Sequence, residues 1–95
     1  MPAIPERDGL LNHGRDASGP ARRATAVTPD DAGDLSAYAK ALYVGAPGDV
    51  RVLTVGAEDG AFTTFANHPV GWLPVQVRRV LATGTTASQI VAAFD

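Results

Sequence analysis

After position 40, the chain alternates between short runs rich in β-branched and aromatic side chains and turns rich in glycine, proline and aspartate. The runs cover residues 41–44, 50–55, 61–66, 72–83 and 88–94. Runs of this composition, bounded by such turns, are typical of strands. Five strands with regular turn signals predict an all-β fold, either a small antiparallel β-sandwich or a partly open barrel.

Two turn signals indicate how the first runs are connected. Pro47-Gly48 suits a type II turn after the first run, and Asp59-Gly60 favours a tight hairpin between the second and third. The residues before the first run are ambiguous. Apolar spacing over residues 35–42 fits a helical turn, whereas the β-branched and aromatic end of this stretch fits an extended lead-in.

The apolar residues of the run 72–83 change parity halfway along it. Leu73 and Val77 fall on odd positions, whereas Val80 and Ala82 fall on even ones. A β-bulge near Arg78-Arg79 would bring both sets to the same face. We therefore expect one long, bulged strand here.

The run "DVRVLTV" is apolar on both faces. Val50 and Val52 share one face, and Leu53 and Val55 share the other, because side chains in a strand alternate. The second apolar face needs a cover. We predict that a neighbouring copy of the chain covers Leu53 and Val55, and the alternative is a second sheet of the same chain.

The first 34 residues differ in composition from the rest. All six aromatic residues and nine of the ten valines lie beyond them. A segment this poor in apolar groups cannot fold by itself. We predict an extended N-terminal arm over residues 1–34 and a β-sandwich domain over residues 35–95. Ile4, Leu10 and Leu11 are the expected anchors of the arm, either on its own domain or on a partner.

Composition argues against several classes of protein. The chain has no cysteine, so neither a disulfide framework nor a thiolate metal site is available. A net charge of -2 offers no electrostatic footprint for nucleic acid or an anionic membrane. The apolar runs are far shorter than the roughly 20 residues of a membrane helix. We expect no direct nucleic-acid or membrane partner and a product assembled in the cytosol.

The polar residues predict no catalysis. His13 and His68 have no second histidine at metal-ligand spacing, and no serine has a nucleophile-elbow context. The acidic residues Asp30, Asp31 and Asp34 lack the spacing of a calcium loop and suit turns or caps. We therefore predict no enzyme activity, no metal and no cofactor.

Trp72 and Arg78 have the same parity in the run 72–83. An aromatic ring beside a cation is one way to build a sugar-binding platform, because apolar sugar faces stack on indole. A carbohydrate-binding β-sandwich module is therefore the alternative function. A tryptophan in such a position is more often packed in a core or at a subunit contact.

Three stretches carry a resemblance to a known family: "VTPDDAGDL", "ALYVGAPGDVRVLTVG" and "LPVQVRRVLATGTTASQIVAAF". In this order they resemble the head-spike base proteins of gene transfer agents and related tailed phages. The resemblance runs from about Val27 to Phe94. The chain departs from the family at "AEDGA" and "NHPVGW", and the segment before Val27 has no counterpart.

The resemblance implies a structural component of a phage-like particle, assembled in the bacterial cytoplasm and located on the capsid surface at its five-fold vertices. It implies a homopentamer, with the major capsid protein and a spike fibre protein as partners. A domain of about 60 residues without disulfide or metal also buries little area, so oligomerisation would stabilise it. The predicted interface residues are Ile4, Leu10, Leu11, Leu53, Val55, Trp72 and Arg78.

Overall fold

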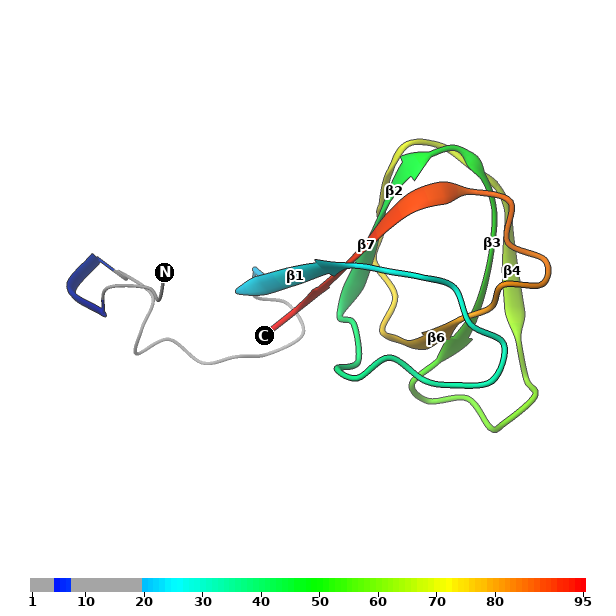
Figure 1. Cartoon of the computed structure of the whole chain (residues 1–95), viewed down its shortest axis with the longest axis horizontal. Helices are drawn as coiled ribbons and strands as arrows, with labels where there is room; N and C mark the ends of the chain where they lie inside the picture. The colour runs from blue at the N-terminus through cyan, green and yellow to red at the C-terminus, as the bar shows by residue number, and fades with distance from the viewer. Residues whose placement is uncertain (1–4, 8–19) are drawn as a thin grey trace.

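The computed structural model describes residues 5–7 and 20–95, and the regular secondary structure of this part of the chain is almost entirely β-strand (Figure 1). A single 3-10 turn, η1, covers Pro5–Arg7. The strands are β1 (Arg23–Ala26), β2 (Ala41–Ala46), β3 (Gly48–Thr54), β4 (Thr63–His68), β5 (Gly71–Leu73), β6 (Val77–Val80) and β7 (Ser88–Phe94). Within the described ranges, no helix has the length and apolar character needed to span a membrane.

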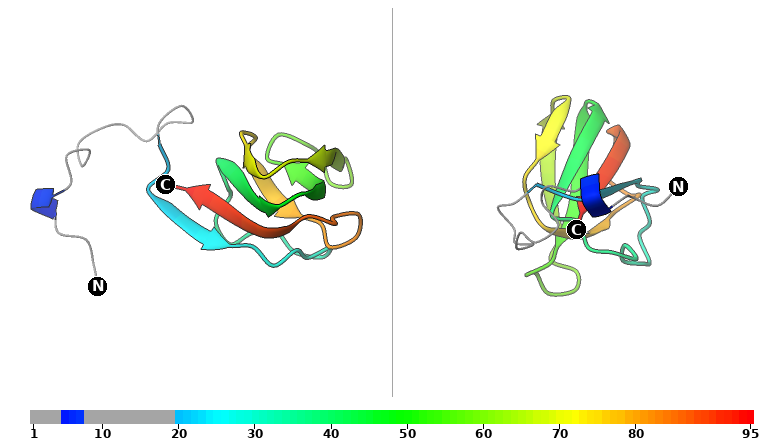
Figure 2. Two further views of the ribbon diagram at one scale, coloured as in Figure 1. Left: turned by 90° about the horizontal axis from the view of Figure 1, so that it is seen from above. Right: turned by 90° about the vertical axis from the view of Figure 1, so that its left-hand side faces the viewer.

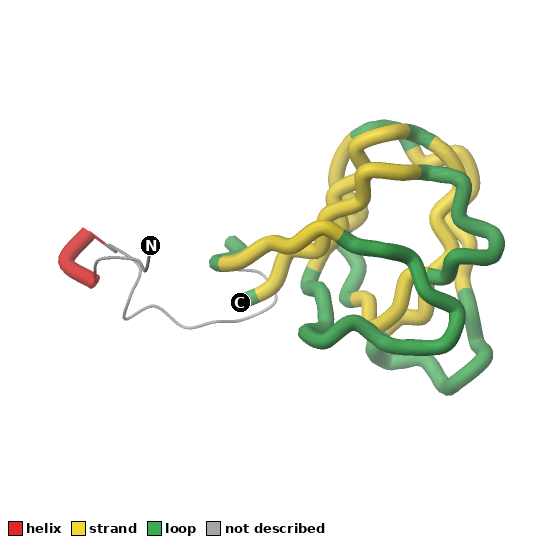
Figure 3. The backbone as a smooth tube through the Cα atoms, viewed as in Figure 1, coloured by secondary structure: helices red, strands yellow, loops and turns green. Residues whose placement is uncertain are grey.

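The strands form two antiparallel sheets that face each other (Figures 1 and 2). The four-stranded sheet has the order β1-β7-β2-β5, and the three-stranded sheet has the order β4-β3-β6. The predicted all-β sandwich is therefore confirmed. Figure 3 shows that the remainder of the sandwich consists of loops.

Alternation along the strands builds the core between the sheets. Leu42 and Val44 of β2 are fully buried, as are Val50 and Val52 of β3. Both pairs belong to one apolar cluster with Val77, Val80, Ile90 and other residues of both sheets. The inward face of each strand therefore matches the period of two seen in the sequence.

The chain crosses between the sheets after β2, with only Pro47 between β2 and β3. Gly48 follows with a φ of +155°. A Cβ atom at this position would lie 2.6 Å from the backbone nitrogen of Ala87. Only glycine fits this crossing without a shift of the neighbouring backbone.

The hairpin predicted at Asp59-Gly60 joins β3 to β4, with Gly60 at a φ of +85°. Its loop covers residues 55–62 and is longer than the tight turn expected from the sequence. The last predicted strand coincides with β7.

The prediction of one long strand over residues 72–83 is wrong, because this run is split into β5 and β6 in different sheets. Pro74 has no N–H group to donate to a ladder. The backbone N–H of Val75 instead donates to the carbonyl of Leu73 at 2.9 Å, which closes a tight turn around the proline. The chain therefore leaves one sheet and enters the other.

The bulge predicted near Arg78 is confirmed. Leu53 pairs with Arg79, but the next residue of β3, Thr54, pairs with Val77, so Arg78 is the extra residue on β6. The extra residue restores a common face, since Val77 and Val80 are both buried in the core.

Residues 27–39, which we call the strap, contain no helical turn, bend at 31–32 and 36–37, and run beside β6 from Asp30 on. The N–H groups of Asp30, Leu35 and Ala39 donate to the carbonyls of Val80, Arg78 and Val77 at 2.7–2.9 Å. These long-range bonds replace the local bonds of a helical turn, so the extended interpretation of this region is correct.

The predicted arm is paired with the sandwich from Arg23 on. β1 pairs with β7 over four residues, and the N–H of Val27 donates to the carbonyl of Ile90 at 2.9 Å. Val27 is partly buried against the core. The boundary at residue 34 stays a prediction, but residues 23–34 are paired with the domain that follows them.

Candidate interaction surfaces

The two residues predicted to form the second apolar face of this run, Leu53 and Val55, differ in burial. Leu53 is fully buried within its own chain, whereas Val55 is 37% exposed. A side chain with no exposed area leaves nothing for a neighbouring copy to cover. The prediction that Leu53 contacts another copy is therefore corrected in favour of packing inside the chain, and the prediction for Val55 stays untested.

Among the described residues, the most exposed large apolar one is Trp72, in β5 at one edge of the four-stranded sheet. Its side chain is 58% exposed, and Val70, just before β5, is 54% exposed. Tyr43 lies opposite Trp72 in β2, and the two rings meet edge to face with centroids 5.2 Å apart. We call Val70, Trp72 and Tyr43 the β5 corner. The tyrosine holds the indole in place while leaving much of it open to solvent.

The same register continues the β5 corner across the whole outer face of the sheet. Tyr43 also pairs with Val91 of β7, and Val91 pairs with Ala26 of β1. Trp72, Tyr43, Val91 and Ala26 therefore form one row across four strands, because cross-strand partners lie on the same face. The row has no charged member. The outward orientation of Tyr43 could be predicted from alternation along the strand, since its neighbours Leu42 and Val44 point inward. Its pairing with Trp72 could not be predicted in this way.

At the opposite edge of this sheet, β1 is exposed along its whole length. Its alternate residues Arg23 and Thr25 pair with Phe94 and Ala92, and Ala92 belongs to the core cluster. Arg23 and Thr25 are nevertheless exposed, although their partners in β7 face the core. The three-stranded sheet therefore does not cover β1. Figure 1 shows β1 and the end of β7 projecting from the sandwich.

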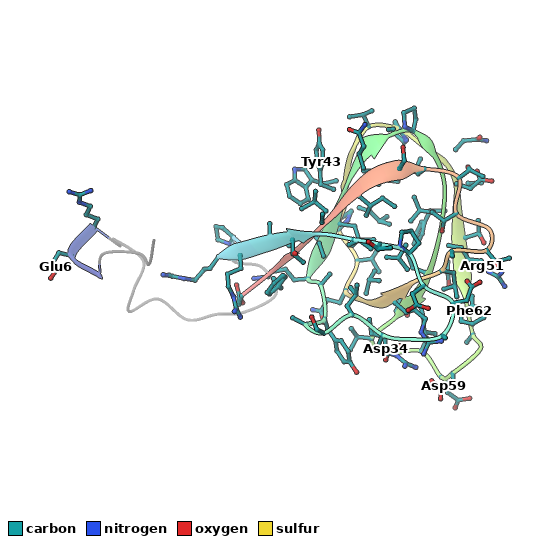
Figure 4. All side chains as sticks on the ribbon, in the orientation of Figure 1. Glu6, Asp34, Tyr43, Arg51, Asp59 and Phe62 are labelled. Carbon is teal, nitrogen blue, oxygen red and sulfur yellow. The ribbon has the colours of Figure 1, made fainter. Side chains whose placement is uncertain are left out.

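One acidic side chain of the strap, Asp34, binds both arginines of β6. Asp34 accepts from Arg78 Nη1 at 3.0 Å and from Arg79 Nε at 2.8 Å. Arg78 Nη2 lies 2.8 Å from Asp59 Oδ1 in the β3–β4 loop (Figure 4). Hydrogen bonds from Arg79 and then Arg78 lower the pKa of Asp34 below its ordinary value.

Asp31 joins the strap to Thr83, which follows β6 in the chain. It accepts hydrogen bonds from the hydroxyl of Thr83 at 2.6 Å and from the Thr83 N–H at 2.9 Å. These bonds, the side-chain bond foremost, lower the pKa of Asp31. Asp31 and Asp34 thus join the strap to the sandwich, whereas only Asp30, which accepts from the Ala32 N–H at 2.8 Å, has the turn role expected of these residues. Among the described residues, no group of three or more histidine, aspartate or glutamate side chains is placed to hold a metal ion.

The structure does not bring Trp72 and Arg78 together. Trp72 lies on the outer face of the four-stranded sheet, whereas Arg78 lies in β6 of the other sheet and is paired with Asp34 and Asp59. The sugar platform inferred from their shared parity is therefore wrong, because the chain changes sheets between them. The interface role predicted for Arg78 stays a prediction. Ile4, Leu10 and Leu11 lie outside the described residues.

The exposed β1 edge and the uncharged row are the main surface features of the four-stranded sheet. No protein-family model matches the chain, and the search of curated proteins gives no match. Among solved structures, it is similar to a chain from the capsid of a native GTA particle, computed with C5 symmetry. The two share 35% sequence identity and superpose with a TM-score of 0.78, covering 90% of this chain and 98% of the other.

Such identity over nearly the whole of the related chain shows common descent. The chain belongs to the family of this GTA capsid component. The resemblance to structural proteins of gene transfer agents and phages, found in the sequence, is confirmed at that level.

Proposed function

We propose that this protein is a head-spike base: a structural, non-enzymatic component of a phage-like particle that sits on the capsid vertices and anchors a spike fibre. The observation that carries the proposal is the match to a GTA capsid chain over 98% of that chain's length. The sequence blocks from Val27 to Phe94 support the spike-base assignment within this family. The protein acts by geometry, presenting one surface to the capsid and another to the fibre.

The proposed assembly is a homopentamer on the capsid surface, with the major capsid protein beneath it. The five-fold symmetry under which the related particle was computed supports this number. A closed ring needs two different surfaces on each copy, one for each neighbour. The four-stranded sheet has two unlike edges, β1 and β5, and is suited to such contacts.

Imaging of particles that lack the chain tests the proposal. Electron cryo-microscopy of such particles should show capsids that close normally but lose density at the five-fold vertices, together with the fibre. Re-expression of the chain in the same strain should restore both densities. Missing density in the shell itself or in the tail would contradict the assignment.

The absence of catalysis is tested separately. We expect the purified protein to hold no stoichiometric metal by elemental analysis and to hydrolyse none of a panel of generic ester, peptide and glycoside substrates. Zinc or calcium at one equivalent per chain would overturn this part of the proposal.

A further inference from the structure

We infer that the two open edges of the four-stranded sheet bind each other between copies, so that β1 of one copy docks on the β5 corner of the next. The inference rests on the proposed function, which requires a ring of identical chains. It assigns the ring contact to named residues: Ala24 and Ala26 on one side, and Val70 and Trp72 on the other.

Trp72 of the β5 corner has the properties of a central interface residue. Trp72 is held by Tyr43, yet more than half of its side chain is exposed. Tryptophan is among the residues that contribute most to binding when a partner covers it. No lysine, arginine, aspartate or glutamate lies between Asn67 and Val77, so the partner surface should be apolar too.

The β1 edge offers a surface of complementary size. Ala24 and Ala26 pair with Ala93 and Val91 and share the outer face with them, so this part of the sheet is shallow. A large indole fits against small side chains better than against bulky ones. The one charged residue of β1, Arg23, is engaged within the chain, with its guanidinium over the Phe94 ring at 4.9 Å and Nε bonded to the Asp95 carbonyl at 3.2 Å.

A second copy accounts for both surfaces at once. β1 and β5 lie at opposite edges of one sheet, and a contact between unlike edges passes from copy to copy until the rotation closes. A foreign partner bound at either edge would leave the other exposed, and an unprotected sheet edge promotes aggregation. The contact between copies leaves neither edge open.

Two single variants test the contact from its two sides. Trp72→Ser removes the indole from the β5 corner, and Ala26→Glu places a charge on β1. Both residues are exposed, so each variant should keep the circular dichroism spectrum of the wild-type chain. The thermal midpoint should fall only by the amount that ring formation adds to the wild type. Tyr38→Ser is the matched control, because Tyr38 is an aromatic residue of the strap with 51% exposure.

Native mass spectrometry of the full chain at tens of micromolar gives the readout. The wild type and Tyr38→Ser should form rings, and each of the other variants should be monomeric. A mixture of Trp72→Ser and Ala26→Glu should form a one-to-one heterodimer and nothing larger, because only one intact β1 edge meets one intact β5 corner.

Rings in either single variant, or a mixture that stays monomeric, would overturn the inference and leave the proposed function standing. A wild-type chain that stays monomeric would overturn the inference and the proposed ring together, and the vertex density of particles would then test the spike-base assignment alone.

Discussion

The two sheets of this protein differ in how far their outward-facing apolar side chains are exposed to solvent. In the three-stranded sheet, Leu53 on the outer side of β3 is fully buried by its own chain, and the strap occupies the edge of β6. In the four-stranded sheet, Trp72 is 58% exposed, and no further strand of the described chain pairs with either edge strand. An apolar residue on the outer face of a strand is therefore not by itself a sign of an interface, because each sheet meets the need for cover in its own way.

The difference has a physical cause in the strap. Residues 27–39 supply backbone donors to β6 and carboxylates to Arg78 and Arg79. Figure 4 shows Asp34 and Asp59 at one end of the sandwich and Tyr43 at the other. The ion pairs of the strap and the aromatic residues of the β5 corner therefore lie at different ends of the sandwich. A partner bound at the β5 corner need not disturb the strap.

The largest expected effect tests whether Leu53 is truly covered by its own chain. Leu53→Ala should lower the free energy of unfolding by roughly 2–5 kcal/mol, because it leaves a cavity at a fully buried site. Urea unfolding in the monomeric Trp72→Ser background gives the measurement. An unchanged midpoint would mean that this face is covered by another copy, and the contrast between the sheets would disappear.

Two truncations sharpen the comparison at the strap. Removal of residues 1–19 should leave the unfolding midpoint unchanged, because this segment has few large apolar residues that could add to a core. Removal of residues 1–34 also deletes β1, Val27 and Asp34, and should cost on the order of 2 kcal/mol from lost apolar burial alone. Equal stability of the two truncated chains would show that the strap does not help to close the three-stranded sheet.

Acid should loosen the strap before it affects the β5 corner. The pKa of Asp34 is lowered in the folded chain, so its ionised form stabilises the fold above the ordinary value of 3.8, and this stability is lost as pH falls below that value. Asp34→Asn should therefore be less stable than wild type near neutral pH, and the gap should close under acid. Thermal unfolding between about pH 2 and pH 7 measures this, with Glu58→Gln, in the exposed loop, as the control for loss of one charge. A gap that persists at the acid end would mean that the ion pairs are not its cause.

The extent of sequence prediction differs between the fold and the candidate surfaces. The strands, the β3–β4 hairpin and the bulge at Arg78 follow from residue types and from a period of two, which are local properties. The exposed tryptophan of the β5 corner was among the predicted contact residues, but its pairing with Tyr43 was not predicted. Its supposed neighbour Arg78 belongs to the other sheet.

The amino-acid sequence by itself determined the strands β2, β3, β4 and β7 and which side chains of each share a face, because these depend on neighbours along the chain. It did not indicate β1, which falls in the predicted arm. Only the tertiary structure decided that the chain changes sheets at Pro74, that the strap runs beside β6 and that Leu53 is covered while Trp72 is open. Each of these depends on pairing between segments far apart in sequence, and a strand pattern is compatible with many such pairings.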